Sequence, residues 1–288
     1  MVAATESPVR KKTEVVVAAR KRSDRWQGQG TLVALRVVVI AVVLGLWQVL
    51  SGPVLPEYAV SKPTEVAASL VELLGSASGW SDIRATVIEV VAGFSMGVVL
   101  GAVLGLVLGS FPLAGRVLEP LIAAFNGIPK IALAPLFLLF FGIGAWSKIT
   151  IAMIGPAFVM FYNIYLGLRL RERELVEIVQ VMGGRRLHLL VYVTIPTLAA
   201  PFFAALKTGG PLAILGVIGA EFIASTEGLG HGLFTAAQNL DAASEFAGLI
   251  VLIAMTLILN GLLSWLDSLA LKRLGLTPRS RPSAAEHS

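Results

Sequence analysis

The sequence predicts an all-helical membrane protein with six transmembrane helices. Of its 288 residues, 56% are hydrophobic and only 14% are charged, whereas a soluble globular domain carries about 25% charged residues. Six apolar segments each approach or exceed the length of about 20 residues that crosses a bilayer as a helix. Lys and Arg gather between and beside these segments. This composition excludes an ordinary soluble enzyme, and the absence of Cys excludes a disulfide scaffold.

The six segments follow one another along the chain, at residues 32–51, 84–109, 117–141, 147–168, 196–223 and 246–271. Only helices satisfy their backbone hydrogen bonds over such runs in lipid. The third segment is interrupted at residues 126–130 (NGIPK) and at Ala134-Pro135, and the fourth at Gly155-Pro156. Broken or kinked helices are therefore expected there, either lining a translocation path or simply bent.

Three regions are predicted: a disordered basic tail over residues 1–30, a transmembrane domain over residues 31–272 and a disordered tail over residues 273–288. Thr64 is expected to cap a short surface helix that runs to about Leu74. Lys and Arg concentrate in the two tails and in the loop at residues 169–195. By the positive-inside rule, both termini and this loop are expected in the cytoplasm, and the protein is expected to cross the plasma membrane.

A stripe of glycines marks the second segment, with one glycine every four residues: Gly93, Gly97, Gly101, Gly105 and Gly109. Small residues at this spacing let another helix approach closely, because no side chain intervenes. The partner is either another helix of the same chain or a surface that acts between subunits or in gating. In either case, a large side chain at Gly101 should separate the helices.

Charged side chains inside apolar segments are candidates for function, because they are costly in lipid. Four qualify: Glu89, Lys130, Lys207 and Glu221. Glu89 and Glu221 are expected near the outer ends of their helices. Lys207 follows Pro196 by 11 residues, or roughly 16 Å along a helix, which places it near mid-membrane. It is part of a structural ion pair, a side chain that snorkels to the membrane surface, or a contact for a substrate, and an anionic substrate would favour the last.

The loop at residues 169–195 is too polar to span a membrane and too patterned for an irregular loop. Leu175, Ile178, Val179 and Met182 form one apolar stripe at helical spacing. Gly183-Gly184 interrupts that helix, and a second short amphipathic run leads to Pro196, which opens the fifth segment. Two short helices with a glycine hinge are expected on the cytoplasmic surface, where they bind either the membrane or a partner protein.

This loop resembles the cytoplasmic signature of binding-protein-dependent ABC importer permeases: Glu-Ala-Ala, three residues, Gly, nine residues, Ile-x-Leu-Pro. Glu177 and Gly183 match the first two positions, and Val193, Ile195 and Pro196 match the end. Ile178 and Val179 depart from the two alanines. Residues 128–149, 55–74 and 219–233 look like the nitrate, sulfonate and taurine branch, which includes permeases for thiamine-precursor pyrimidines and riboflavin.

The resemblance implies a type I ABC importer permease that works as a homodimer with a pair of cytoplasmic ATP-binding subunits and an extracytoplasmic substrate-binding protein. Coupling helices at about residues 172–190 would insert into the ATPase, through Glu177, Met182, Gly183, Gly184, Arg185, Arg186 and Pro196. Lys207, Glu221 and Asn163 are candidates for the substrate path. ATP and Mg²⁺ are expected on the partner, because the chain contains no Gly-Lys pair and hence no phosphate loop.

No catalytic residues, metal site, bound cofactor or nucleic-acid partner are predicted for the chain. The substrate is expected to be a sulfonate, taurine, nitrate or a related anion, with a pyrimidine or riboflavin as a further possibility. Two other functions compete with this one. A stand-alone secondary transporter or channel would move its substrate without ATP, and a non-transporting scaffold would leave the two-helix loop unexplained.

Overall fold

A computed structural model describes residues 29–170 and 173–273, so the predicted tails lie almost entirely outside the described residues. Every regular element of the described part is a helix, as the sequence predicts. The chain divides into two compact units, residues 1–66 and 67–288.

The first unit contains α2 (Gln29–Leu50), which covers the first predicted span, and the beginning of α3 (Pro63–Gly75). The expectation that Thr64 caps α3 is wrong, because the helix already begins at Pro63. Glu65 instead reaches back to the backbone N–H of Lys62, and the Thr64 hydroxyl accepts a hydrogen bond from Gln48. Ser61 donates to the Glu65 carboxylate, and this hydrogen bond lowers the pKa of Glu65.

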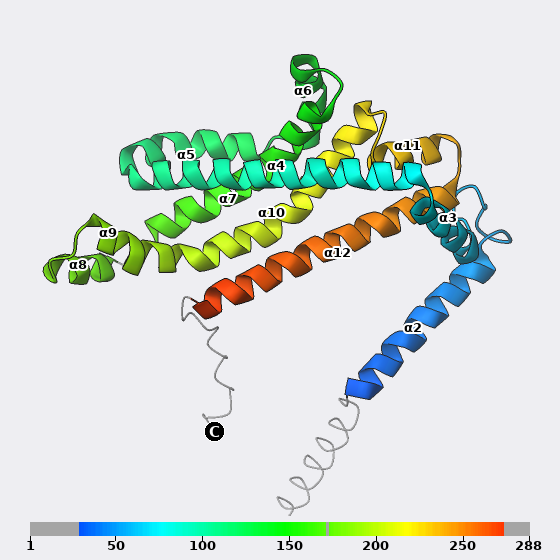
Figure 1. Ribbon diagram of the computed structural model, residues 1–288, viewed down its shortest axis with the longest axis horizontal. Helices are drawn as coiled ribbons and strands as arrows, with labels where there is room; N and C mark the ends of the chain where they lie inside the picture. The colour runs from blue at the N-terminus through cyan, green and yellow to red at the C-terminus, as the bar shows by residue number, and fades with distance from the viewer. Residues whose placement is uncertain (1–28, 171–172, 274–288) are drawn as a thin grey trace, which may run out of the picture. The chain divides into compact units, whose positions relative to one another are not determined.

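The second unit is a helical bundle in which α7 (Ala145–Arg169) is central. In its most apolar stretch, α7 buries 56% of its residues, against 22% for α12 (Ala242–Arg273). The helices α4 (Ala77–Ser110) and α10 (Ile195–Ala224) pack against α7. Together, α4, α7, α10 and α12 run alongside one another (Figure 1).

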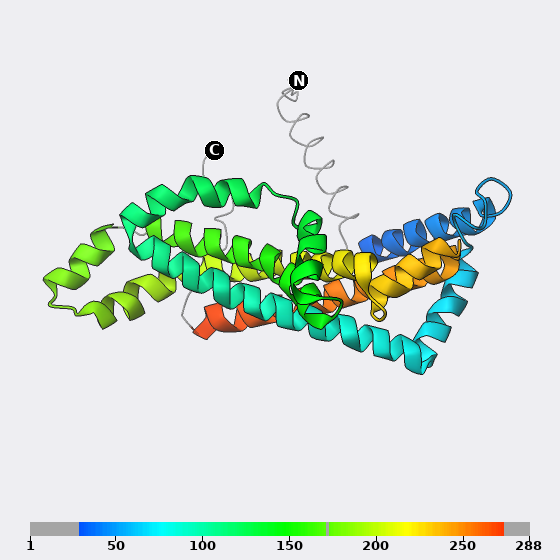
Figure 2. The same cartoon turned by 90° about the horizontal axis from the view of Figure 1, so that it is seen from above.

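The two ends of this bundle carry different short elements (Figures 1 and 2). At one end lie α8 (Arg173–Val181) and α9 (Arg186–Leu189), which follow α7 in the chain. At the other end, α11 (Leu229–Gln238) joins α10 to α12. The apolar segments do not predict helix α11, because its ten residues lie between the fifth and the sixth of them.

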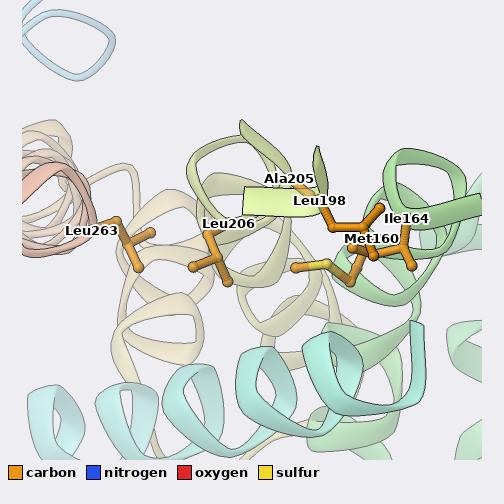
Figure 3. Packing of buried hydrophobic residues seen from close by; sticks show 6 residues of the cluster. All are labelled: Met160, Ile164, Leu198, Ala205, Leu206 and Leu263. Atoms are coloured by element: carbon orange, nitrogen blue, oxygen red, sulfur yellow. The ribbon is translucent and has the colours of Figure 1, made fainter. Parts of the chain in front are cut away.

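The core lies where α7, α10 and α12 meet (Figure 3). Met160 and Ile164 from α7 pack there against Leu198 and Leu206 from α10 and Leu263 from α12. Met160 is fully buried. A contact of this kind fixes the relative positions of the helices, because the interdigitated side chains leave little room for sliding.

Within residues 29–170 and 173–273, five helices are long and apolar enough to cross a membrane: Gly30–Leu50, Ala77–Ser110, Ala145–Arg169, Leu187–Ile223 and Ala242–Arg273. The third predicted segment takes another form. It is divided into α5 (Pro112–Asn126), the 3₁₀ turn Lys130–Leu133 and α6 (Ala134–Phe141). The break falls at the Gly-Ile-Pro sequence that predicted it, because Pro129 lacks the N–H that would continue the helix. In the fourth segment, α7 continues through Pro156.

Candidate functional site

The two short helices predicted at residues 172–190 are present, and a glycine turn joins them. At the end of α8, the Gly184 N–H donates to the Val179 carbonyl (2.8 Å) and the Gly183 N–H donates to Gln180 (3.0 Å). This pair of hydrogen bonds defines a Schellman cap, which requires a left-handed residue directly after the helix. Gly183 supplies it, with φ of 75°.

Gly184 is required for a different reason. A Cβ atom at Gly184 would lie 2.5 Å from a methyl group of Val179 and 2.6 Å from its carbonyl oxygen. The backbone therefore passes too close to α8 for any larger residue. The two glycines together turn the chain sharply between α8 and α9, so the angle between the helices is set by local geometry.

The apolar stripe of α8 is largely exposed. Met182 of this stripe is 81% exposed, and Val181, which stands beside it, is 89% exposed. Ile178 is also exposed, as are the charged residues Glu177 and Arg185. An apolar surface of this kind, bordered by charges, is typical of a site for another protein. Of the remaining predicted coupling residues, Arg186 begins α9.

The second short helix passes into a membrane helix without a break. After α9, residues 190–194 form one turn of π-helix, and α10 begins at Ile195 with Pro196 in its first turn. The His188 side chain accepts a hydrogen bond from the Arg185 N–H (3.1 Å) and its ring stacks on Tyr192. A displacement of α9 is therefore transmitted directly to α10, because the two share one continuous helical backbone.

The glycine stripe of α4 packs against α7 of the same chain, which is the first of the two partners that the sequence allows. A Cβ atom at Gly97 would lie 2.4 Å from the Met153 carbonyl oxygen, and one at Gly101 would lie 2.3 Å from the Ala157 carbonyl oxygen. At Gly93 and Gly105 the nearest atoms of α7 would lie at 2.5 Å and 2.9 Å. Over these three turns, the two helix backbones are in direct contact.

Lys207 forms an ion pair with Asp267 of α12 at 2.5 Å. The sequence allows a structural ion pair, a snorkelling side chain or a substrate contact for Lys207. The structure contains the ion pair, and a role in the substrate path stays a prediction. Asn163 lies on α7 and donates a hydrogen bond to the carbonyl of Val159 one turn earlier (2.9 Å). Asp267 was not singled out from the sequence, since its position near the end of the last segment resembles an ordinary helix end.

The third candidate for the substrate path, Glu221, lies at the end of α10 in a buried polar cluster. The Thr86 hydroxyl donates to its Oε1 (2.8 Å), and the Gly230 N–H donates to its Oε2 (2.6 Å). Nearby, Glu89 forms an ion pair with Lys148 of α7 at 2.5 Å. The structure thus brings Glu89 and Glu221, noted separately in the sequence, to one place.

Lys148 and Thr86 were not singled out from the sequence. Lys148 stands three residues into α7, where a lysine is expected to reach the membrane surface. It is instead 3% exposed in its side chain. The sequence does contain an indication of this role for Lys148, because carboxylates inside apolar segments, such as Glu89 and Glu221, need a charged or polar partner.

The exposed helix pair and the spanning helices are features expected of a membrane transport permease, and the comparison with known families shows that class. Residues 97–275 match the family described as binding-protein-dependent transport system inner membrane component. The chain belongs to this family, as the resemblance of the loop at residues 169–195 predicts.

Similar proteins support the same class. The riboflavin transport system permease protein RibX of Chloroflexus aurantiacus is 33% identical over 250 residues, which are 86% of this chain and 91% of the relative. The formylaminopyrimidine transport permease protein ThiX of Halalkalibacterium halodurans is 26% identical over 72% of this chain and 82% of the relative. The taurine transport system permease protein TauC of Escherichia coli is 25% identical over 84% and 90%.

Among solved structures, an inward-facing conformation of the methionine ABC transporter MetNI has a TM-score of 0.54. It covers 73% of this chain and 98% of the matched chain, at 18% sequence identity. The similarity shows that the fold is that of an ABC importer permease. The chain is therefore a multi-pass inner-membrane permease subunit of an ABC importer, as the sequence predicts.

Proposed function

We propose that two copies of this chain form the path by which a small heteroaromatic compound, of the riboflavin or pyrimidine kind, enters the cell. The names of two relatives support this substrate class: RibX is a riboflavin permease and ThiX a formylaminopyrimidine permease. The names of other relatives refer to sulfonates and taurine, so an anion is the second candidate.

The arrangement of charges favours the heteroaromatic compound. Lys148 and Lys207, the lysines inside α7 and α10, are each ion-paired within the chain, with Glu89 and Asp267. A transported sulfonate or nitrate would have to compete with these carboxylates for its cation. A flat aromatic ring needs no such charge and binds to apolar and aromatic surfaces instead.

The α8–α9 pair is proposed to dock on a cytoplasmic ATPase subunit that binds ATP and Mg²⁺, with both termini on the same side of the membrane. The observation that carries this role is the combination of exposed Val181 and Met182 with the rigid turn at Gly183 and Gly184. Force on α8 reaches α10 through α9 and the π-helical turn. An extracytoplasmic binding protein is proposed to deliver the substrate at the opposite end of the bundle.

Reconstitution tests this function. The chain is placed in liposomes with its cognate ATPase subunit and binding protein, and uptake of labelled riboflavin, a pyrimidine and taurine is compared. We expect ATP-dependent uptake of a heteroaromatic compound, reduced at least tenfold by Glu177→Lys. Uptake of taurine alone would refute the substrate class. Uptake driven by an ion gradient without ATP would identify a secondary transporter and refute the coupling role.

A further inference from the structure

The buried polar cluster at the α11 end of the bundle has an unbalanced charge. Three helices contribute one ionisable group each: Glu89 from α4, Lys148 from α7 and Glu221 from α10. The side chains of Glu89 and Lys148 are both 3% exposed, and Glu221 is 1% exposed as a residue. Two carboxylates and one ammonium would leave one net negative charge away from water.

One oxygen of this cluster is without a hydrogen-bond partner. Glu89 Oε1 is paired with Lys148, whereas Glu89 Oε2 is buried and has no partner among the described residues. The carboxyl groups of Glu89 and Glu221 are neighbours, because Glu221 accepts a hydrogen bond from Thr86, which lies one turn before Glu89 on the same face of α4. Two ionised carboxylates cannot form a hydrogen bond, because neither carries a donor.

A single proton satisfies both requirements, since it removes the excess charge and supplies the missing donor. We propose that Glu89 and Glu221 bind one proton between them, carried on Glu89 Oε2 and donated to the Glu221 carboxylate, and that this proton-binding site fastens the start of α11 to α4 and α7. The single negative charge that remains on the two carboxyl groups balances the charge of Lys148, which contacts Glu89 Oε1, and the three groups together carry no net charge. Paired carboxyl groups that share a site hold a proton in this way, because the second negative charge is repelled by the first.

The site fastens α11 through its backbone. The Glu221 carboxylate accepts from the Gly230 N–H, and the Leu229 N–H donates to Thr86 (2.9 Å). Gly228 lies directly beside this carboxylate, and a Cβ atom there would be 2.1 Å from Oε1. Displacement of the Glu221 carboxylate would therefore release the turn at residues 228–230.

Other charged groups around the site set the direction of its response. Asp82 of α4 accepts a hydrogen bond from the Gly228 N–H (2.8 Å), and the negative charge of Glu227 also acts on Glu89. Lys148 additionally donates to Ser225 (3.1 Å). His231 is the titratable side chain of α11. Among the described residues, it forms no hydrogen bond or ion pair with the cluster. Loss of the proton adds a negative charge to a site already bordered by carboxylates, so the turn opens as the pH rises.

The site lies at the end of the bundle opposite α8 and α9 (Figures 1 and 2). The helices α7 and α10 therefore connect the α8–α9 pair at one end of the bundle to the proton site at the other. The proton site is independent of ATPase docking, since none of its residues belongs to the α8–α9 pair.

Infrared spectroscopy of the purified protein in lipid nanodiscs tests the proposal. We expect a C=O band of a buried protonated carboxyl group at neutral pH in the wild-type protein. The band should be lost in Glu89→Gln and in Glu221→Gln, because each variant leaves a single carboxylate, whose negative charge Lys148 balances without an added proton. It should be retained in Glu72→Gln, which removes an exposed carboxylate of α3 and serves as the matched control.

Thermal unfolding provides a second readout that does not depend on the spectral assignment. Glu89→Gln keeps a donor toward Glu221 and should fold normally. The melting temperature of the wild-type protein should fall relative to that of Glu89→Gln as the pH rises from about 6 to about 9, because the folded state holds a proton that the unfolded chain releases.

Three results would overturn the proposal. The first is a wild-type spectrum without the buried carboxyl band, and the second is a band that persists in Glu89→Gln. The third is a melting temperature that depends on sodium at constant pH, which would assign the excess charge to a bound metal cation instead of a proton.

Discussion

Substitution of Gly101 by alanine should separate α4 from α7 and destabilise the protein. The added Cβ would lie 2.3 Å from the Ala157 carbonyl oxygen and 2.8 Å from the Met160 Cβ. Non-bonded atoms prefer roughly 3.5 Å, so the helices would have to move apart by about 1 Å. The obstruction is backbone and a Cβ, neither of which can rotate away.

The magnitude follows from two opposing effects. Overpacking of a tight contact costs about 1–3 kcal/mol, and the neighbouring contacts at Gly97 and Gly105 are weakened by the same movement. Alanine in place of glycine favours the helix by about 1 kcal/mol. The net loss is about 1–2 kcal/mol, which lowers the melting temperature by roughly 2–8 °C in a chain of this size.

The matched control is Gly261→Ala in α12, where a Cβ atom would meet no other atom within 4 Å. This variant gains the helix preference without the clash and should melt at or above the temperature of the wild-type protein. The assay is thermal unfolding in the same detergent, with light scattering to detect aggregation. The reasoning is refuted if Gly101→Ala is as stable as the wild-type protein, or if both variants are equally destabilised.

Three further predictions concern other contacts. Gly183→Ala should cost about 1 kcal/mol in α8 because of its positive φ, and it should reduce ATP-driven uptake with little change in the amount of folded protein; unchanged uptake would argue against a required turn. Lys207→Met should lower the melting temperature, because it leaves Asp267 unpaired, and Asp267→Asn in the same protein should restore most of it; a double variant no better than the single one would show that the ion pair is not the cause. Gly228→Ala should lower the yield of monodisperse protein in size-exclusion chromatography more than Gly232→Ala does. The first places a Cβ against Glu221 at φ of 107°, whereas the second meets open space. Equal yields would contradict the close contact between Gly228 and the Glu221 carboxylate.

The spanning helices could be predicted because lipid requires long apolar runs, and these are visible in the sequence without any knowledge of packing. The predicted span 196–223 corresponds to α10 (Ile195–Ala224), for example. The turn at Gly183 was also visible, since only local residues determine it. α11 could not be foreseen in the same way, because its stability depends on Thr86 and Glu221, which are distant in the sequence.

The polar cluster shows the same limit. The long apolar runs of the sequence place Glu89 and Glu221 inside membrane helices. The pairing of Glu89 with Lys148, however, depends on how α4 and α7 meet. The glycine stripe predicted a close approach without its partner, and the structure identifies α7. Sequence patterns therefore indicate which residues must find a partner, and the tertiary packing decides which partner they find.

The most direct test of the coupling role is a crosslink between this chain and its ATPase subunit. The chain has no Cys, so Met182→Cys introduces a single reactive thiol at an exposed position of the α8–α9 turn, and Trp146→Cys places one at the opposite end of α7. A thiol-specific crosslinker applied to the complete transporter should join the Met182→Cys variant to the ATPase, with a yield that changes on addition of ATP, and should leave the Trp146→Cys variant unlinked. Equal crosslinking at both positions would contradict the proposal that α8 and α9 dock on the ATPase subunit. So would the absence of any crosslink in a Met182→Cys complex that transports substrate.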